Sequence, residues 1–335
     1  MQPLTAKRLG LICGGMVAVL IVIILFALKL GAVPISVADL AMLLFRRIAG
    51  AEEPLPTEYQ MIVFNIRLPR ILLSVLVGAS LSVAGAGFQA LLRNPLADPY
   101  VLGVSSGAAL GAILALGAPS LLTPLAAFGG ALAAIACVYL LGRRGGQLDS
   151  YTLLLAGIIT ASFLSALILF LMTTLPSRDT RGMAFWLMGD LSSSSPIPAG
   201  LLFLVMLVAI GAIYTTAADL NLLLSGEQEA LHLGVDVPRV KLVVYLSASL
   251  LTALAVSVSG AIGFVGILVP HIIRLLFGSD YRVLIPTTAV GGAIVIVLAD
   301  ALARTVNAPN ELPVGAITAM AGAPVFLYLL RRRLS

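Results

Sequence analysis

Charged residues are scarce in this chain of 335 residues. Only 10% of the residues are Asp, Glu, Lys or Arg, whereas 60% are hydrophobic and the mean hydropathy is +1.10. A soluble domain carries about 25% charged residues, so this composition excludes an ordinary soluble protein. Apolar runs recur from Leu9 to the end of the chain, each near the ~20 residues that a bilayer-spanning helix needs. Most of the surface is therefore expected to face lipid.

Cysteine and histidine are also scarce, with two of each. Cys13 and Cys137 lie in apolar stretches and share no metal-type spacing with His232 or His271, so we predict neither a disulfide framework nor a metal site. The sequence has no Gly-x-x-x-x-Gly-Lys-Ser/Thr loop, which excludes a P-loop nucleotide site in this chain. It also lacks the constellations of a membrane-embedded enzyme, and His271 is interpreted as a structural histidine.

Glycine, proline and charged clusters divide the apolar runs into about ten predicted transmembrane helices. This pattern predicts an all-α polytopic membrane protein with one permease domain over residues 1–335, because helices are the segments that satisfy their own backbone in lipid. The predicted helices cover 11–31, 66–89, 100–117, 122–141, 151–175, 197–217, 240–260, 262–278, 283–303 and 313–330. The Gly-rich block 85–107 is echoed in 260–292, which suggests inverted halves at about 66–175 and 240–330. Chance similarity between Gly-rich helices is the alternative.

Basic residues beside the spans predict the orientation, because cytoplasmic loops retain Lys and Arg. They place both termini in the cytoplasm, and they occur at Lys7, Arg8, Arg143, Arg144, Arg239, Lys241, Arg282 and Arg331 to Arg333. Several arginines then fall on the outer face, namely Arg67, Arg70, Arg178, Arg181 and Arg304. These side chains either snorkel toward lipid headgroups or form a cationic platform for an acidic partner.

An ion-coupled secondary transporter of a small solute is the alternative function. It would need carboxylates inside the bundle to carry the ion. Most candidates fall in predicted loops, at Asp98, Asp149, Asp190 and Glu311. Asp300 lies near a helix end four residues before Arg304, and we expect these two side chains to pair.

Several motifs occur in a specific order along the chain. They begin with Arg67-Leu-Pro-Arg70, Gly85-Ala-Gly-Phe-Gln89, Asn94-Pro-Leu-Ala-Asp-Pro99 and Leu102-Gly-Val-Ser-Ser-Gly107, and continue with Gly260-Ala-Ile-Gly-Phe-Val-Gly266, Val269-Pro-His-Ile-Ile-Arg274 and Glu311-Leu-Pro-Val-Gly315. On these motifs the chain resembles the FecCD-type permease family of ABC importers, which take up iron siderophores, haem and vitamin B12. The resemblance covers nearly the whole chain after residue 60, and it implies the inverted-repeat fold of a type II importer permease.

The resemblance implies three kinds of functional residue. Arg67, Arg70 and Arg304 match positions that hold acidic residues of a binding protein. The expected cytoplasmic gate consists of Asn94, Pro95 and Leu96, together with Ser150 and Tyr151. The polar segment 218–239 matches the cytosolic coupling segment that rests on the ATPase, with contacts expected at Glu227, Glu229, Ala230, Leu231, Leu233, Gly234 and Asp236.

Two of these segments also have simpler interpretations from the residues alone. Asn94 to Pro99 could be only a tight cytoplasmic turn, because Pro95 and Pro99 cannot continue a helix. The polar segment could be an ordinary amphipathic surface helix, with Leu224, Leu231 and Val235 on one face.

The resemblance also implies a set of partners and a location. The expected assembly is a homodimer of the permease with two ABC ATPase subunits, which bind ATP and Mg, and a periplasmic substrate-binding protein. The assembly would lie in the lipid of the bacterial inner membrane, with both termini of the permease in the cytoplasm. This chain itself is expected to be no enzyme, to bind no cofactor or metal, and to contact no nucleic acid. The cargo stays open between an iron chelate, haem and cobalamin.

Overall fold

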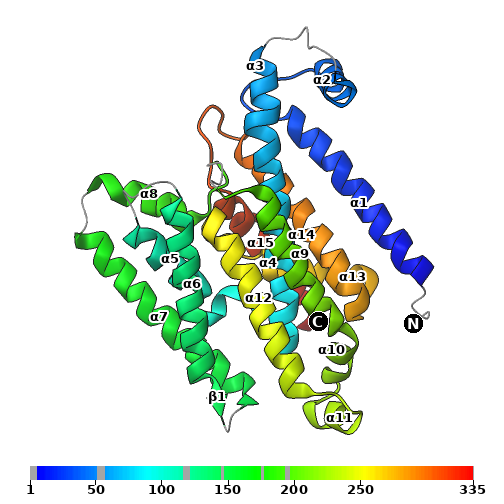
Figure 1. The fold of residues 1–335 in the computed structure, drawn as a ribbon, viewed down its shortest axis with the longest axis vertical. Coiled ribbons are helices and arrows are strands. Elements are labelled where there is room, and N and C mark those ends of the chain that lie inside the picture. The colour runs from blue at the N-terminus through cyan, green and yellow to red at the C-terminus, as the bar shows by residue number, and fades with distance from the viewer. Residues whose placement is uncertain are drawn as a thin grey trace.

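The computed structural model describes residues 6–50, 57–115, 121–144, 147–174, 177–192 and 197–334. Helices make up almost all of this part of the chain (Figure 1). In the first half they are α1 (Ala6–Lys29), α2 (Val37–Ala49), α3 (Thr57–Gln60), the π-helix η1 (Met61–Arg67), α4 (Leu68–Leu91), the 3-10 helix η2 (Pro99–Leu102), α5 (Val104–Leu114), α6 (Leu122–Leu141) and α7 (Ser150–Thr174).

The second half continues the same helical pattern. Its helices are α8 (Ser177–Met188), α9 (Ala199–Thr215), α10 (Ala217–Leu223), α11 (Glu227–His232), α12 (Val237–Ser259), α13 (Val265–Phe277), α14 (Tyr281–Ala303) and α15 (Val314–Leu334). The described strands are β1 (Arg143–Arg144) and β2 (Gln147–Leu148), which form an antiparallel pair between α6 and α7. The predicted all-α fold is therefore confirmed.

Each predicted span has an apolar helix in the described part of the chain. Six helices are long and apolar enough to cross a membrane, and α9 with α10 forms a further span with a 49° bend. The shorter apolar helices α5, α13 and α15 account for the remaining predicted spans. The prediction missed α2 and α8, which are not membrane-length apolar runs. In α2 the Ser36 side chain accepts a hydrogen bond from the Asp39 amide, and Gly50 ends the helix in a left-handed conformation.

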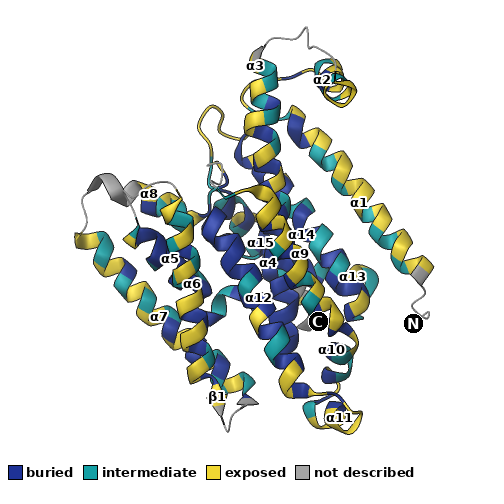
Figure 2. Ribbon diagram, in the orientation of Figure 1, coloured by how far each residue is buried: buried dark blue, intermediate teal, exposed yellow. Residues whose placement is uncertain are grey.

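Helix α4 lies at the centre of the bundle, and almost all of its residues are buried (Figure 2). It packs against α9, α12, α13 and α14. Glycines allow this close approach, because a Cβ on Gly78 would overlap the Gly292 carbonyl oxygen of α14, and one on Gly85 would overlap Gly266 of α13. Such small-residue contacts are typical of helices that associate in lipid, where packing replaces the hydrophobic effect. The outer helices α1, α6 and α7 remain largely exposed.

The two ends of the bundle carry different elements. Figure 1 shows α2, α3 and α8 at one end, and α11 with the β1–β2 pair at the other. Arg67 precedes α4 at the α3 end, and α4 runs from there toward the end of the bundle that carries α11. The expected docking residues and the expected coupling segment thus lie at opposite ends of the molecule.

Replacing Gly78 with Ala is expected to lower the unfolding temperature of the full-length protein in detergent. The added methyl group would push α4 away from the α14 backbone, and such overpacking costs about 1–3 kcal/mol. Gly211→Ala in α9 is the matched control, because no heavy atom lies within 4 Å of the added Cβ. Equal unfolding temperatures for the two variants would show that the contact between α4 and α14 is not tight.

Candidate functional site

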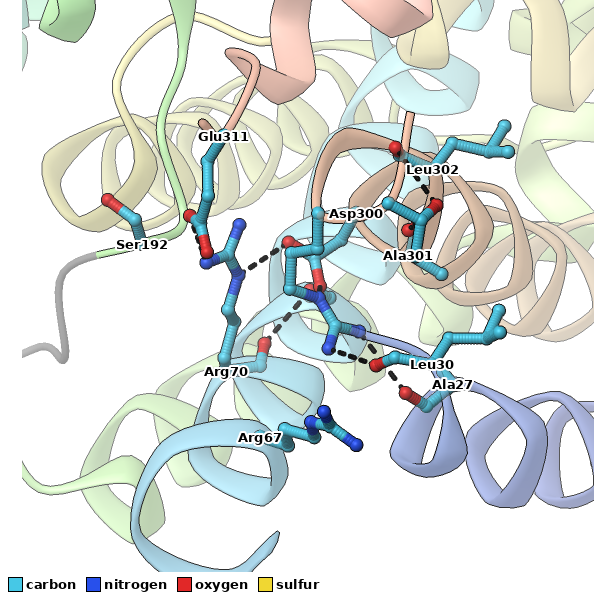
Figure 3. A network of polar contacts seen from close by, with 12 residues as sticks. Ala27, Leu30, Arg67, Arg70, Ser192, Asp300, Ala301, Leu302 and Glu311 are labelled. Atoms are coloured by element: carbon cyan, nitrogen blue, oxygen red, sulfur yellow. Dashed lines mark hydrogen bonds and ion pairs between the residues drawn. The ribbon is translucent and has the colours of Figure 1, made fainter. Parts of the chain in front are cut away.

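A buried ion-pair network joins α4, α14 and the segment after α14 at the α3 end of the bundle (Figure 3). Arg70 donates from Nε to Asp300 Oδ1 at 2.6 Å and from Nη1 to Glu311 Oε2 at 2.6 Å. Arg304 donates from Nε to Asp300 Oδ2 at 3.0 Å, which confirms the pairing expected one helical turn apart. Asp300 has no exposed surface, so a single buried carboxylate pairs with two guanidinium groups.

The same network reaches the C-terminal end of α1. Arg67 donates from Nη1 to the carbonyl oxygens of Leu28 at 2.7 Å and Lys29 at 3.1 Å. Arg304 donates from Nη1 to the carbonyl oxygen of Leu30 at 3.0 Å. The last carbonyl groups of a helix lack intrahelical partners and carry partial negative charge. The two guanidinium groups therefore satisfy the end of α1.

This arrangement corrects the expectation of an open cationic platform. Arg67, Arg70 and Arg304 are only 4%, 7% and 6% exposed, and their guanidinium groups hold partners within the chain. Helix α1 packs against α14, and its carbonyl groups accept hydrogen bonds from Arg67 and Arg304, whereas Arg70 holds Asp300 and Glu311. Glu311 remains accessible, with 43% of its side chain exposed, and Arg70 Nη2 is buried without a hydrogen-bond partner in the described structure. Whether the three arginines hold a binding protein stays a prediction.

The expected gate segments adjoin each other at the opposite end of α4. The chain leaves α4 through Arg93, whose φ of 49° lies in the left-handed region. The side chain of Asn94 then accepts a hydrogen bond from the Leu96 amide at 2.9 Å. Ser150, the first residue of α7, donates to the Leu91 carbonyl oxygen at 2.9 Å. The bond from Ser150 holds the start of α7 against Leu91, three residues before Asn94. Leu96 and Tyr151 are 46% and 76% exposed, so both side chains are accessible.

The expected coupling segment contains the short helix α11 between two positive-φ glycines, Gly226 and Gly234. Leu231 and Leu233 are 53% and 65% exposed, whereas Ala230 is fully buried. Ala230 therefore contacts the body of the protein. The predicted face shared by Leu224, Leu231 and Val235 is wrong for Val235, which is 7% exposed. The chain turns at Gly234, and the Val235 amide then donates to the Ala230 carbonyl oxygen at 3.0 Å.

A lysine connects α11 to the start of α7. Lys241 on α12 is 6% exposed and lies 2.7 Å from the Glu227 carboxylate. It also donates to the carbonyl oxygen of Leu148 at 3.2 Å, two residues before Ser150. Sequence reasoning used Lys241 only as an orientation signal, since its partners come from distant segments. No group of three His, Cys, Asp or Glu residues that could hold a metal occurs within the described ranges.

Comparisons with known proteins agree on one family. The model of the FecCD transport family matches residues 19–332. The cobalamin import system permease protein BtuC of Halobacterium salinarum is 46% identical over 281 residues, which cover 83% of this chain and 75% of that protein. The hemin transport system permease protein HmuU of Yersinia pestis is 43% identical, with 80% of this chain and 83% of that protein covered.

Two further matches extend over nearly the whole chain. The Fe(3+) dicitrate transport system permease protein FecC of Escherichia coli is 37% identical and covers 98% of both chains. A solved structure of a metal-chelate type ABC transporter in an inward-facing conformation has a TM-score of 0.82 at 31% identity, with 96% of this chain and 99% of that chain covered.

Asp300→Asn is expected to destabilise the protein strongly, because it removes the one carboxylate that pairs with both buried arginines. Breaking a buried ion pair costs about 3–5 kcal/mol. Glu311→Gln is the control within the same network, and because its side chain is 43% exposed it should cost no more than about 1 kcal/mol. The free energy of unfolding in detergent measures both effects, and an equal loss in the two variants would contradict the central role of Asp300.

Proposed function

The chain belongs to the FecCD transport family and is a membrane-spanning permease of an ABC importer, and we propose that it carries an iron chelate, haem or cobalamin from the periplasm to the cytoplasm. The fold shared with a metal-chelate type ABC transporter over 96% of this chain carries the proposal. The names of the relatives support these three cargo classes. They do not distinguish among them for this chain.

The energy source of transport lies outside this chain. The permease is not an enzyme, because ABC importers hydrolyse ATP on separate ATPase subunits. The proposed assembly contains two copies of the permease, two ATPases and a periplasmic binding protein, in the inner membrane with both permease termini in the cytoplasm. The proposed inverted halves remain 66–175 and 240–330. Each half contains a long helix, a break and a short helix. In the first half these helices are α4 and α5, and in the second half they are α12 and α13.

Docking of the binding protein is proposed at the α3 end of the bundle. The arginines there are buried and already hold internal partners, whereas Glu311, which accepts from Nη1 of Arg70, is 43% exposed. An acidic side chain of the binding protein is therefore proposed to approach Arg70 at the position of Glu311. An incoming carboxylate would replace Glu311 on Arg70 and leave Asp300 in place between Arg70 and Arg304.

Coupling is proposed to run from α11 to the gate through Lys241. The exposed Leu231 and Leu233 give α11 an apolar surface for the ATPase. A displacement of α11 would act on Glu227, whose ion pair with Lys241 connects it to the backbone of Leu148. Since Ser150 and Tyr151 follow directly, the same movement would shift the α7 side of the gate relative to Asn94, Pro95 and Leu96.

The proposed function predicts ATP-dependent uptake in a reconstituted system. The permease would be placed in proteoliposomes with the ATPase and binding protein encoded beside its gene, and accumulation of ferric siderophore, haem and cobalamin would be measured separately. We expect one of these cargoes to accumulate only with ATP on the ATPase side. Accumulation driven by an ion gradient without ATP would instead support a secondary transporter.

Lys241→Gln is expected to uncouple ATP hydrolysis from transport in the same proteoliposomes. The amide removes the ion pair with Glu227 and keeps a side chain of similar length, so ATPase activity should persist while uptake falls about tenfold or more. Lys7→Gln, at an exposed lysine of α1 outside the coupling segment, is the matched control and should retain uptake. Equal uptake by both variants would exclude Lys241 from the coupling route.

A further inference from the structure

A polar cavity of about 310 Å³ is lined by residues of the expected gate loop, of α13 and of the start of α14. Its lining includes Arg93 and Pro95 from the gate loop, Arg274 from α13, Leu224 after α10, and Tyr281 at the start of α14. It therefore touches both the expected gate and the segment that leads to α11. Among the lining residues that the structure describes, none is acidic and two are arginines.

Arg274 brings an uncompensated charge into this cavity. Its side chain is half-buried, and it donates from Nη1 to Gln89 Oε1 at 2.5 Å and from Nη2 to the Tyr281 hydroxyl at 3.4 Å. Both acceptors are neutral, and no carboxylate forms an ion pair with Arg274 among the residues that the structure describes. A half-buried guanidinium without a counter-charge is costly, so the geometry favours an anion from outside the chain.

Arg93 adds a second cation to the lining of the cavity. It is exposed, it forms no ion pair with a described residue, and its backbone has a φ of 49°. Glycine adopts this conformation without strain, whereas a residue with a side chain does so at a cost. An arginine at this turn therefore places a charge beside the cavity at a position where the backbone itself would favour glycine.

Asp280 lies in the chain between the lining residues Ser279 and Tyr281 and already has partners of its own. Asp280 accepts hydrogen bonds from Arg282 and from the Asn221 side chain at 2.8 Å. The hydrogen bonds from Arg282 hold the pKa of Asp280 at about 2, so Asp280 stays ionised and paired. Asp280 therefore forms no ion pair with Arg93 or Arg274, and both guanidinium groups can pair with an anion from outside the chain.

We propose that this cavity binds a phosphate-type anion between Arg93 and Arg274. Two guanidinium groups, with the hydroxyl groups of Ser279 and Tyr281 in the same lining, offer enough donors for several phosphate oxygens. Leu224 in the wall is 46% exposed, and Leu275 and Leu276 beside Arg274 are 59% and 66% exposed. A cationic pocket next to apolar surface suits the headgroup of an anionic phospholipid. The bound anion would tie the gate loop to α13.

Binding of phosphatidylglycerol to the delipidated full-length permease in detergent tests this site by native mass spectrometry. We expect Arg274→Gln and Arg93→Gly each to weaken phosphatidylglycerol binding about tenfold, because each loses a charge-assisted hydrogen bond. Arg93→Gly should not destabilise the fold, since glycine relieves the left-handed backbone. Lys7→Gln removes an exposed cation that is not in the lining of the cavity and should bind phosphatidylglycerol as the unchanged protein does. Neither the cargo nor the ATPase takes part, so the result is independent of the proposed transport function.

Competition by inorganic phosphate distinguishes the two sources of the anion. If millimolar phosphate displaces the lipid from the unchanged protein, the site takes free phosphate as well as headgroups, and if it does not, the site is specific for the lipid. Both results support a phosphate site when Arg274→Gln and Arg93→Gly bind more weakly. Equal phosphatidylglycerol binding by the unchanged protein and the three variants would overturn the proposal. So would binding of zwitterionic phosphatidylcholine to the unchanged protein as tightly as phosphatidylglycerol.

Discussion

The position of α1 against the rest of the bundle depends on one buried carboxylate. Asp300 pairs with Arg70 on α4 and with Arg304, the residue directly after α14. Arg304 also donates hydrogen bonds to the carbonyl oxygens of Ala27 and Leu30 at the end of α1. Helices in lipid gain little from hydrophobic burial, so polar contacts and close packing decide how they associate. Without Asp300, two guanidinium groups would face each other in a buried site. This network therefore fixes three helices at the end of the molecule where the binding protein is proposed to dock.

Close packing of small residues holds α4 against its neighbours from this end of the molecule to the other. The glycine contacts of α4 with α14 and α13 bring backbones together along the length of α4, and Gln89 near its C-terminus bonds to the Gly266 carbonyl oxygen at 3.1 Å. The gate loop begins directly after this anchored end. Movement at the gate is thus expected in the loop and at the start of α7, while α4 itself remains a fixed axis.

Polar side chains at the α11 end connect segments that a transporter must move together. Lys241 joins α11 to the segment before α7, and Arg274 holds Gln89 on α4. One contact lies on the α7 side of the gate and the other on the α4 side. The cavity between Arg93 and Arg274 is placed so that an anion would stiffen the α4 side, and force from α11 would then act mainly on α7.

The sequence by itself determined the spans, because an apolar run of membrane length has one stable form in lipid. It also determined the pairing of Asp300 with Arg304, since residues four apart on a helix are neighbours, and the break at Asn94 to Pro99, where proline ends a helix. Only the tertiary structure decided the partners of Arg67, Arg70 and Lys241. These partners are distant in the sequence, and Glu311 follows Arg70 by 241 residues. Every residue offers the same backbone carbonyl group, and the carboxylates of Asp300, Glu311 and Glu227 lie far from Arg70 and Lys241 in the sequence. No pattern in the sequence therefore shows which of these acceptors a cation will reach. Helix packing makes that choice, and it also turned the expected open platform into a buried network.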